Sequence, residues 1–120
     1  MSGPVGDDEC ILRHVTSGKR VSHQDFKLRE GKGETGLSVS RNLPTLPAAL
    51  VARVSRSPAD SRVAAARVGD VRALGLEVVP DPLPDDPGHA LIVSGAVPLS
   101  NDLTVRERLR SMFHLLPPGA

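Results

Sequence analysis

The densest group of residues able to do chemistry lies in a proline-rich stretch, where three carboxylates precede a histidine. These residues are Asp81, Asp85, Asp86 and His89. Carboxylates and imidazoles together can bind Zn, Mn or Fe, and the intervening prolines would stiffen their spacing. The spacing matches no metal-binding motif, however, and only one histidine is local. Turn formation explains the aspartates more simply, so we predict no metal site, no cofactor and no catalytic residue here.

A glycine pattern and a single cysteine could also indicate a dinucleotide site and a catalytic nucleophile. Gly31, Gly33 and Gly36 have the spacing of the dinucleotide fingerprint, which must leave a strand and open a helix. Residues 37–40 alternate apolar and polar side chains, so we expect a strand to follow and the glycines to form a plain loop. Cys10 stands beside a predicted strand, and we expect a small buried side chain rather than a nucleophile.

Three polar residues on different predicted strands could line one pocket: Arg13, Ser38 and His89. Taken with Glu77, the order Arg13, Ser38, Glu77 resembles ADP-ribosyltransferase-like domains, which use such residues to hold a nicotinamide dinucleotide. The alternative function is a small nucleotide-binding or metal-binding enzyme domain with this pocket, and the ADP-ribosyltransferase-like arrangement is one form of it. Against it, the chain is short for that fold and has no aromatic residue placed to stack on a nicotinamide.

Charge is unevenly distributed along the chain. Residues 41–72 hold six arginines against two aspartates, whereas residues 73–101 hold four acidic residues and no Lys or Arg. Two opposite patches could steer a protein partner or pair two copies, although a solvated surface would look the same. The residues predicted to bind a partner are Arg53, Arg56, Arg62, Arg67, Asp81, Asp85, Asp86 and His89. The arginines could also contact phosphates of a nucleic acid, which is the second alternative.

Composition narrows the class of protein. The 120 residues carry 15 Lys and Arg against 14 Asp and Glu, so no global charge indicates nucleic acid or an anionic membrane. Only 2% are aromatic, too few for the stacking surfaces of common nucleic-acid modules. One cysteine precludes an intrachain disulfide, and we find neither a secretory signal nor an apolar run of about 20 residues. We therefore expect a cytoplasmic protein that does not enter a membrane.

Periodicity and turn residues predict one small domain over residues 10–116, between a disordered acidic tail at 1–9 and a short tail at 117–120. Residues 62–74 can be read as one helix, or as a strand over 62–67 followed by a short helix opened by Asp70. We favour the second reading, with Gly75 ending the helix in either case. The other predicted elements are strands at 10–15, 37–40, 76–79 and 89–94 and helices at 44–54 and 105–116, while residues 21–28 remain ambiguous.

One stretch resembles known sequences. Residues 71–90, VRALGLEVVPDPLPDDPGHA, together with GLSV at 36–39 and Leu12-Arg13, resemble small uncharacterised bacterial proteins associated with mobile or defence gene clusters. The resemblance implies a bacterial accessory protein and assigns no catalytic residue. We therefore expect an α+β domain of four or five short strands and two or three helices. Its expected function is non-enzymatic: an accessory module that binds another protein, with its oligomeric state left open.

Overall fold

We determined the fold from a computed structural model, which describes residues 3–15, 21–29, 34–41 and 62–116. The helix expected over 44–54, most of the glycine loop before residue 34 and the tail at 117–120 lie outside these residues. Within the described part, no helix has the length and apolar character needed to cross a membrane.

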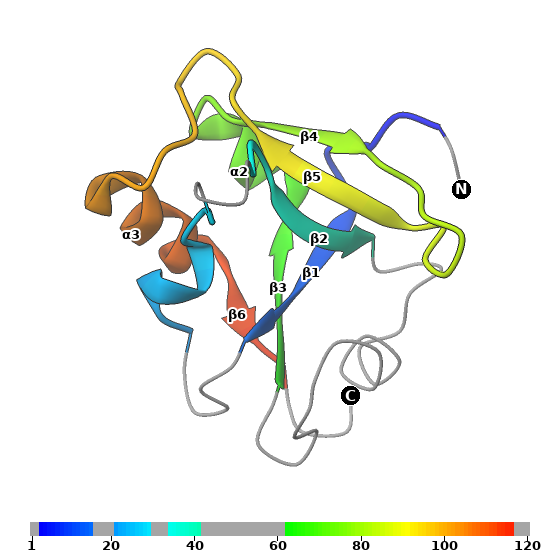
Figure 1. Cartoon of the computed structure of the whole chain (residues 1–120), viewed down its shortest axis with the longest axis horizontal. Helices are drawn as coiled ribbons and strands as arrows, with labels where there is room; N and C mark the ends of the chain where they lie inside the picture. Colours follow the sequence, from blue (N-terminus) through cyan, green and yellow to red (C-terminus); the bar gives the residue numbers. More distant parts are fainter. Residues whose placement is uncertain (1–2, 16–20, 30–33, 42–61, 117–120) are drawn as a thin grey trace.

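The described residues form a six-stranded antiparallel sheet with two α-helices and a short 3₁₀ helix, η1 (Figure 1). This confirms the α+β class, with one strand more than the upper expected number. The strand order is β4-β5-β2-β1-β3-β6. The elements are β1 (Cys10–Val15), η1 (His23–Phe26), β2 (Leu37–Arg41), β3 (Arg62–Arg67), α2 (Val68–Ala73), β4 (Glu77–Pro80), β5 (His89–Val93), α3 (Leu103–Met112) and β6 (His114–Leu115).

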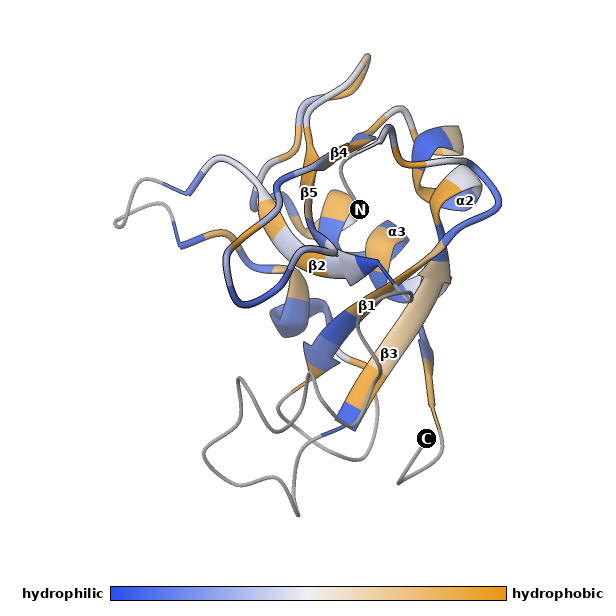
Figure 2. Cartoon of the chain, turned by 90° about the vertical axis from the view of Figure 1, so that its right-hand side faces the viewer, coloured by the Kyte–Doolittle hydropathy of each residue, from blue (hydrophilic) through white to orange (hydrophobic). Residues whose placement is uncertain are grey.

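Side chains alternate between the two faces of the sheet along each strand. The apolar side chains on one face form the main core. Ile11 of β1 faces Ala66 of β3, and both are buried in the main apolar cluster. The middle of β3 is accordingly hydrophobic (Figure 2). The two aromatic rings, Phe26 and Phe113, pack together in that cluster with their centroids 4.9 Å apart. Leu12 points to the other face, where it packs near Val63 in a smaller cluster.

The sheet is divided between β1 and β2. Strand β1 pairs with β3 at six positions, from Cys10 to Val15, but with β2 only at Ile11 and Leu12. Beyond Leu12 the two strands diverge, and η1 and α3 lie on the side where they separate (Figure 1). The division opens space beside Arg13, the residue that follows the last pair.

The ambiguous segment is a strand followed by a short helix, which confirms the favoured reading. Strand β3 ends at Arg67, and α2 begins at Val68, two residues before the expected start. Both Val68 and Val71 are fully buried, so packing rather than an Asp cap sets where this helix begins. Gly75 follows with φ of +93°, a conformation that residues with a Cβ rarely adopt.

The last helix differs from its prediction at both ends. It begins at Leu103 with Asp102 as its N-cap, whose carboxylate accepts a hydrogen bond from the Thr104 N–H at 2.8 Å. It ends at Met112 rather than at residue 116. The chain then pairs with β3 as the two-residue strand β6, so the apolar periodicity of 105–116 spans two kinds of structure.

The first residues also differ from the disordered tail that the sequence predicts. Val5 is only 3% exposed and belongs to the core. The Glu9 carboxylate accepts two hydrogen bonds from Arg41, each 2.6 Å long. Arg41 also donates to the backbone carbonyls of Gly3 and Pro4, so its buried guanidinium holds this segment at both ends. We call residues 3–9 the N-terminal clasp.

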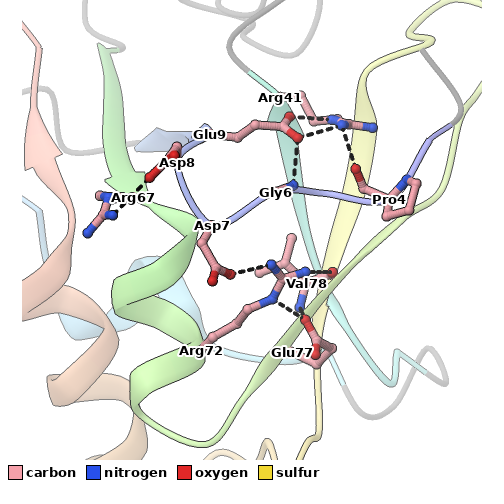
Figure 3. A network of polar contacts seen from close by, with 10 residues as sticks. All are labelled: Pro4, Gly6, Asp7, Asp8, Glu9, Arg41, Arg67, Arg72, Glu77 and Val78. Atoms are coloured by element: carbon pink, nitrogen blue, oxygen red, sulfur yellow. Dashed lines mark hydrogen bonds and ion pairs between the residues drawn. The ribbon is translucent and has the colours of Figure 1, made fainter.

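The two aspartates of the N-terminal clasp bind two further arginines (Figure 3). Asp7 pairs with Arg72 at 2.6 Å, and Asp8 pairs with Arg67 at 3.0 Å. Arg72 in turn contacts Glu77 at 2.5 Å, which links the clasp to β4. Hydrogen bonding to Arg72 holds the pKa of the Glu77 carboxyl below its ordinary value. Each acidic residue of the clasp therefore has its own arginine.

Candidate functional site

The candidate site is a cavity of about 630 Å³ where β1 and β2 separate. That volume lies within the range of about 300–1,000 Å³ typical of small-molecule sites. The three residues of the predicted alternative pocket all line it, although they come from β1, β2 and β5. The described residues that line the cavity are Leu12, Arg13, His14, Gln24, Asp25, Lys27, Arg29, Glu34, Leu37, Ser38, Val39, Ser40, Leu83 and His89.

Arg13 bridges the divided strands with its side chain. Its Nε donates to the Asp25 carbonyl and its Nη1 to the Ser38 carbonyl, both at 2.6 Å. The guanidinium carbon lies 5.7 Å from the centre of the Phe26 ring, within range of a cation–π contact. Burial lowers the pKa of Arg13 to about 10, against the opposing influence of the nearby Asp25 charge, so the guanidinium stays charged at neutral pH.

No carboxylate forms a hydrogen bond or ion pair with Arg13 among the described residues. Its hydrogen bonds go to carbonyl oxygens, which neutralise no charge. The Asp25 carboxylate instead accepts the Ser22 N–H at 2.9 Å as part of the cap of η1. Arg13 is half-buried, and a cation partly withdrawn from water without a hydrogen-bonded anion carries a desolvation cost that an incoming anion can offset.

Further cationic groups surround the same cavity. Lys27 follows η1, and its ammonium contacts no acceptor in the part of the chain that the structure describes. Arg29, by contrast, is engaged by Glu34 through two side-chain hydrogen bonds of 3.0 and 2.7 Å. Of the two carboxylates among the described lining residues, that of Glu34 is thus paired with Arg29 and that of Asp25 caps η1.

Two histidines complete the polar lining. His89 Nδ1 lies 3.0 Å from the carbonyl oxygen of Asp81 and 3.1 Å from its carboxylate. A carbonyl can only accept, so this contact places the proton of the neutral ring on Nδ1 and leaves Nε2 as an acceptor. His14 Nε2 is buried without a hydrogen-bond partner among the described residues, and burial lowers the pKa of that ring.

The acidic residues before His89 have separate environments. Asp85 is exposed, whereas Asp86 is 2% exposed and accepts hydrogen bonds from Ser40 Oγ at 2.8 Å and the Gly88 N–H at 3.2 Å. The carboxylate of Asp81 instead faces the His89 ring. No group of three or more His, Cys, Asp or Glu side chains that could hold a metal ion occurs among the described residues.

The predicted basic patch is only partly described. Arg53 and Arg56 lie outside the described residues. Arg62 donates from Nη2 to the Leu116 carbonyl, and Arg67 binds Asp8 of the N-terminal clasp. The two described arginines therefore stand at opposite ends of β3, and each contacts another part of the same chain.

The ADP-ribosyltransferase-like trio is not assembled. Arg13 and Ser38 meet at the cavity, but Glu77 is not among its lining residues. Glu77 Oε1 accepts from Arg72 and from the N–H of Val78 at 2.8 Å, and Arg72 Nη2 donates to the Val78 carbonyl at 3.2 Å. The hydrogen bonds of the Glu77 carboxylate thus lie along the edge strand β4 and not in the cavity.

Sequence reasoning missed the cavity residues between β1 and β2. Lys27, Arg29 and Glu34 belong to a charged stretch with no clear period, and the ambiguity over 21–28 hid the 3₁₀ helix that directly precedes Lys27. The capping-box spacing of Ser22 and Asp25 was the available signal. The prediction that Cys10 is buried was also wrong, because this side chain is exposed at the start of β1.

Comparison with known proteins adds no assignment: no family model, no curated protein and no solved structure matches this chain.

Proposed function

We propose that this chain is a binding domain for a small anionic ligand, with a phosphate group as the recognised feature. The observation that carries the proposal is Arg13, a half-buried cation that lines a ligand-sized cavity and, among the described residues, donates hydrogen bonds only to carbonyl oxygens. Its two carbonyl bonds and the Phe26 ring fix the guanidinium before any ligand arrives. Such preorganisation reduces the entropy that binding must otherwise lose.

Lys27 supports the same ligand class. Its ammonium has no acceptor within the described residues, so it is available to a phosphate, whereas Arg29 is held by Glu34. One charge-assisted hydrogen bond contributes about 1.5–3 kcal/mol, roughly a tenfold or greater change in affinity. Lys27 is therefore the side chain to change, because Arg13 also joins β1 to β2 and its removal would disturb the fold.

The test is titration calorimetry with inorganic phosphate and adenosine 5′-monophosphate as probes. We expect at least one to bind, and Lys27→Ala to weaken that binding about tenfold. Arg108→Ala is the matched control, because Arg108 is exposed on α3 and is not part of the cavity lining. The proposal fails if neither probe binds wild-type protein, or if both variants lose affinity equally, which would indicate nonspecific attraction.

The other functional predictions stay predictions. An accessory module of a bacterial defence or mobile-element system, docking a cytoplasmic protein through the charged residues, draws support from the exposed Asp85. Its test is whether Asp85→Lys weakens capture of a co-purifying protein without lowering the melting temperature. Nucleic-acid binding by residues 41–72 predicts retention on DNA or RNA that falls steeply with salt.

A further inference from the structure

The His89 side of the cavity has a different chemistry from the Arg13 side. His89 Nε2 makes no hydrogen bond to a described residue, while Nδ1 is held by Asp81. In the neutral ring Nε2 is therefore an acceptor, which suits a hydroxyl or amine of a ligand and not a phosphate oxygen. The cavity thus offers donors at Arg13 and Lys27 and an acceptor at His89.

The strand register shows how far apart the strands that carry Arg13 and His89 lie. Ser40 of β2 pairs with both Leu12 of β1 and His89 of β5, so three strands stand side by side at this level. Two strand spacings place the β1 and β5 backbones about 10 Å apart. Arg13 directly follows Leu12, so its side chain leaves β1 on the opposite face of the sheet from His89, and its guanidinium reaches β2 at the Ser38 carbonyl. Both residues line the same cavity, so one ligand reaching both must be longer than a phosphate ion.

The other lining residues indicate the chemistry of the part of a ligand that would lie between Arg13 and His89. The described lining contains polar side chains able to bind hydroxyls, among them Gln24 and Ser38, and no Phe, Tyr or Trp. Nucleobases are commonly held by stacking on aromatic rings, worth about 1–3 kcal/mol per base. A cavity with hydrogen-bonding groups and no such ring favours a hydroxylated carbon chain over a base.

We infer that the ligand is a sugar phosphate, with its phosphate at Arg13 and Lys27 and a hydroxyl donated to His89 Nε2. Asp81 acts here as a positioning residue, because it fixes the tautomer that makes Nε2 an acceptor. This inference rests on the proposed function and narrows its ligand class. It concerns binding alone and requires no chemical step.

The experiment compares ribose 5-phosphate with inorganic phosphate, ribose and adenosine 5′-monophosphate by calorimetry at pH 7.5. We expect ribose 5-phosphate to bind at least tenfold more tightly than phosphate and no more weakly than the nucleotide. In NMR spectra, the His89 ring resonances should shift with ribose 5-phosphate and not with phosphate. His23 and His114, which are not among the lining residues, provide internal references.

Variants then separate the two ends of the ligand. His89→Gln should remove most of the preference for ribose 5-phosphate over phosphate while leaving phosphate affinity within twofold. If that variant does not fold, the wild-type NMR shifts still decide. The inference is overturned if ribose 5-phosphate binds no better than phosphate, if His89 does not respond to it, or if the nucleotide binds tenfold more tightly than the sugar phosphate. Phosphate binding that depends on Lys27 would leave the proposed function standing in each case.

Discussion

The bond between Glu9 and Arg41 should stabilise the fold more than any other ion pair of the N-terminal clasp. The Arg41 side chain is 4% exposed and that of Glu9 is 29% exposed, so this pair is shielded from water on the arginine side. Removing one partner from a fully buried pair costs about 3–5 kcal/mol. In Glu9→Gln the amide oxygen can still accept one bond, and the carbonyls of Gly3 and Pro4 remain. We therefore expect a loss of about 2 kcal/mol in the free energy of unfolding.

That loss corresponds to a melting temperature about 8 °C lower for a chain of this size. Differential scanning calorimetry is the suitable assay, because the protein has no Trp or Tyr to report unfolding by fluorescence. Asp8→Asn is the matched control. It removes a charge from the same segment, but the Asp8 and Arg67 side chains are 97% and 54% exposed, so no measurable change is expected.

The pH dependence provides a second check on the same pair. Hydrogen bonding to Arg41 lowers the pKa of Glu9 from its ordinary value of 4.5, so the pair stabilises the fold above that pH. The stabilisation is lost as the pH falls through the lowered pKa, and the difference between wild type and Glu9→Gln should shrink over that range. Equal losses in Glu9→Gln and Asp8→Asn, or a difference that does not change with acidification, would refute the reasoning.

Two further changes test packing and loop attachment. A Cβ on Gly75 would lie 2.6 Å from Val97 Cγ2 at a φ of +93°, so Gly75→Ala should destabilise by about 2–3 kcal/mol. Gly3→Ala, where nothing lies within 4 Å of the added carbon, should not change the denaturation midpoint. Asn101→Ala removes bonds of 2.7 and 3.0 Å to the backbone N–H and carbonyl of Leu28, and should cost about 1–3 kcal/mol in urea denaturation.

Local pattern predicted the strands well and the contacts between distant segments poorly. A short apolar run was sufficient to predict the strand at 10–15, and alternation of apolar and polar residues was sufficient for the strand after Gly36. The short strand β6 was missed because Leu115 and Leu116 continue the apolar stripe of α3. Periodicity does not show that Phe113 leaves the helix to extend the core.

The N-terminal clasp shows why composition misleads. Asp7, Asp8 and Glu9 look like a solvated acidic run, yet their arginine partners lie 65, 59 and 32 residues away in sequence. Only the fold brings these partners together. The same holds for the cavity, where Arg13, Ser38 and His89 could be proposed from strand positions, but Lys27 could not be placed without η1.

The contacts of Glu77 and Arg72 also bear on self-association. Strand β4 is one border of the sheet, where free backbone groups can recruit a strand from a neighbouring molecule. Here the Val78 N–H is occupied by Glu77, its carbonyl is occupied by Arg72, and Pro80 has no N–H to offer. The opposite border, β6, is only two residues long. Both borders of the sheet that the structure describes therefore resist the addition of a strand from another molecule.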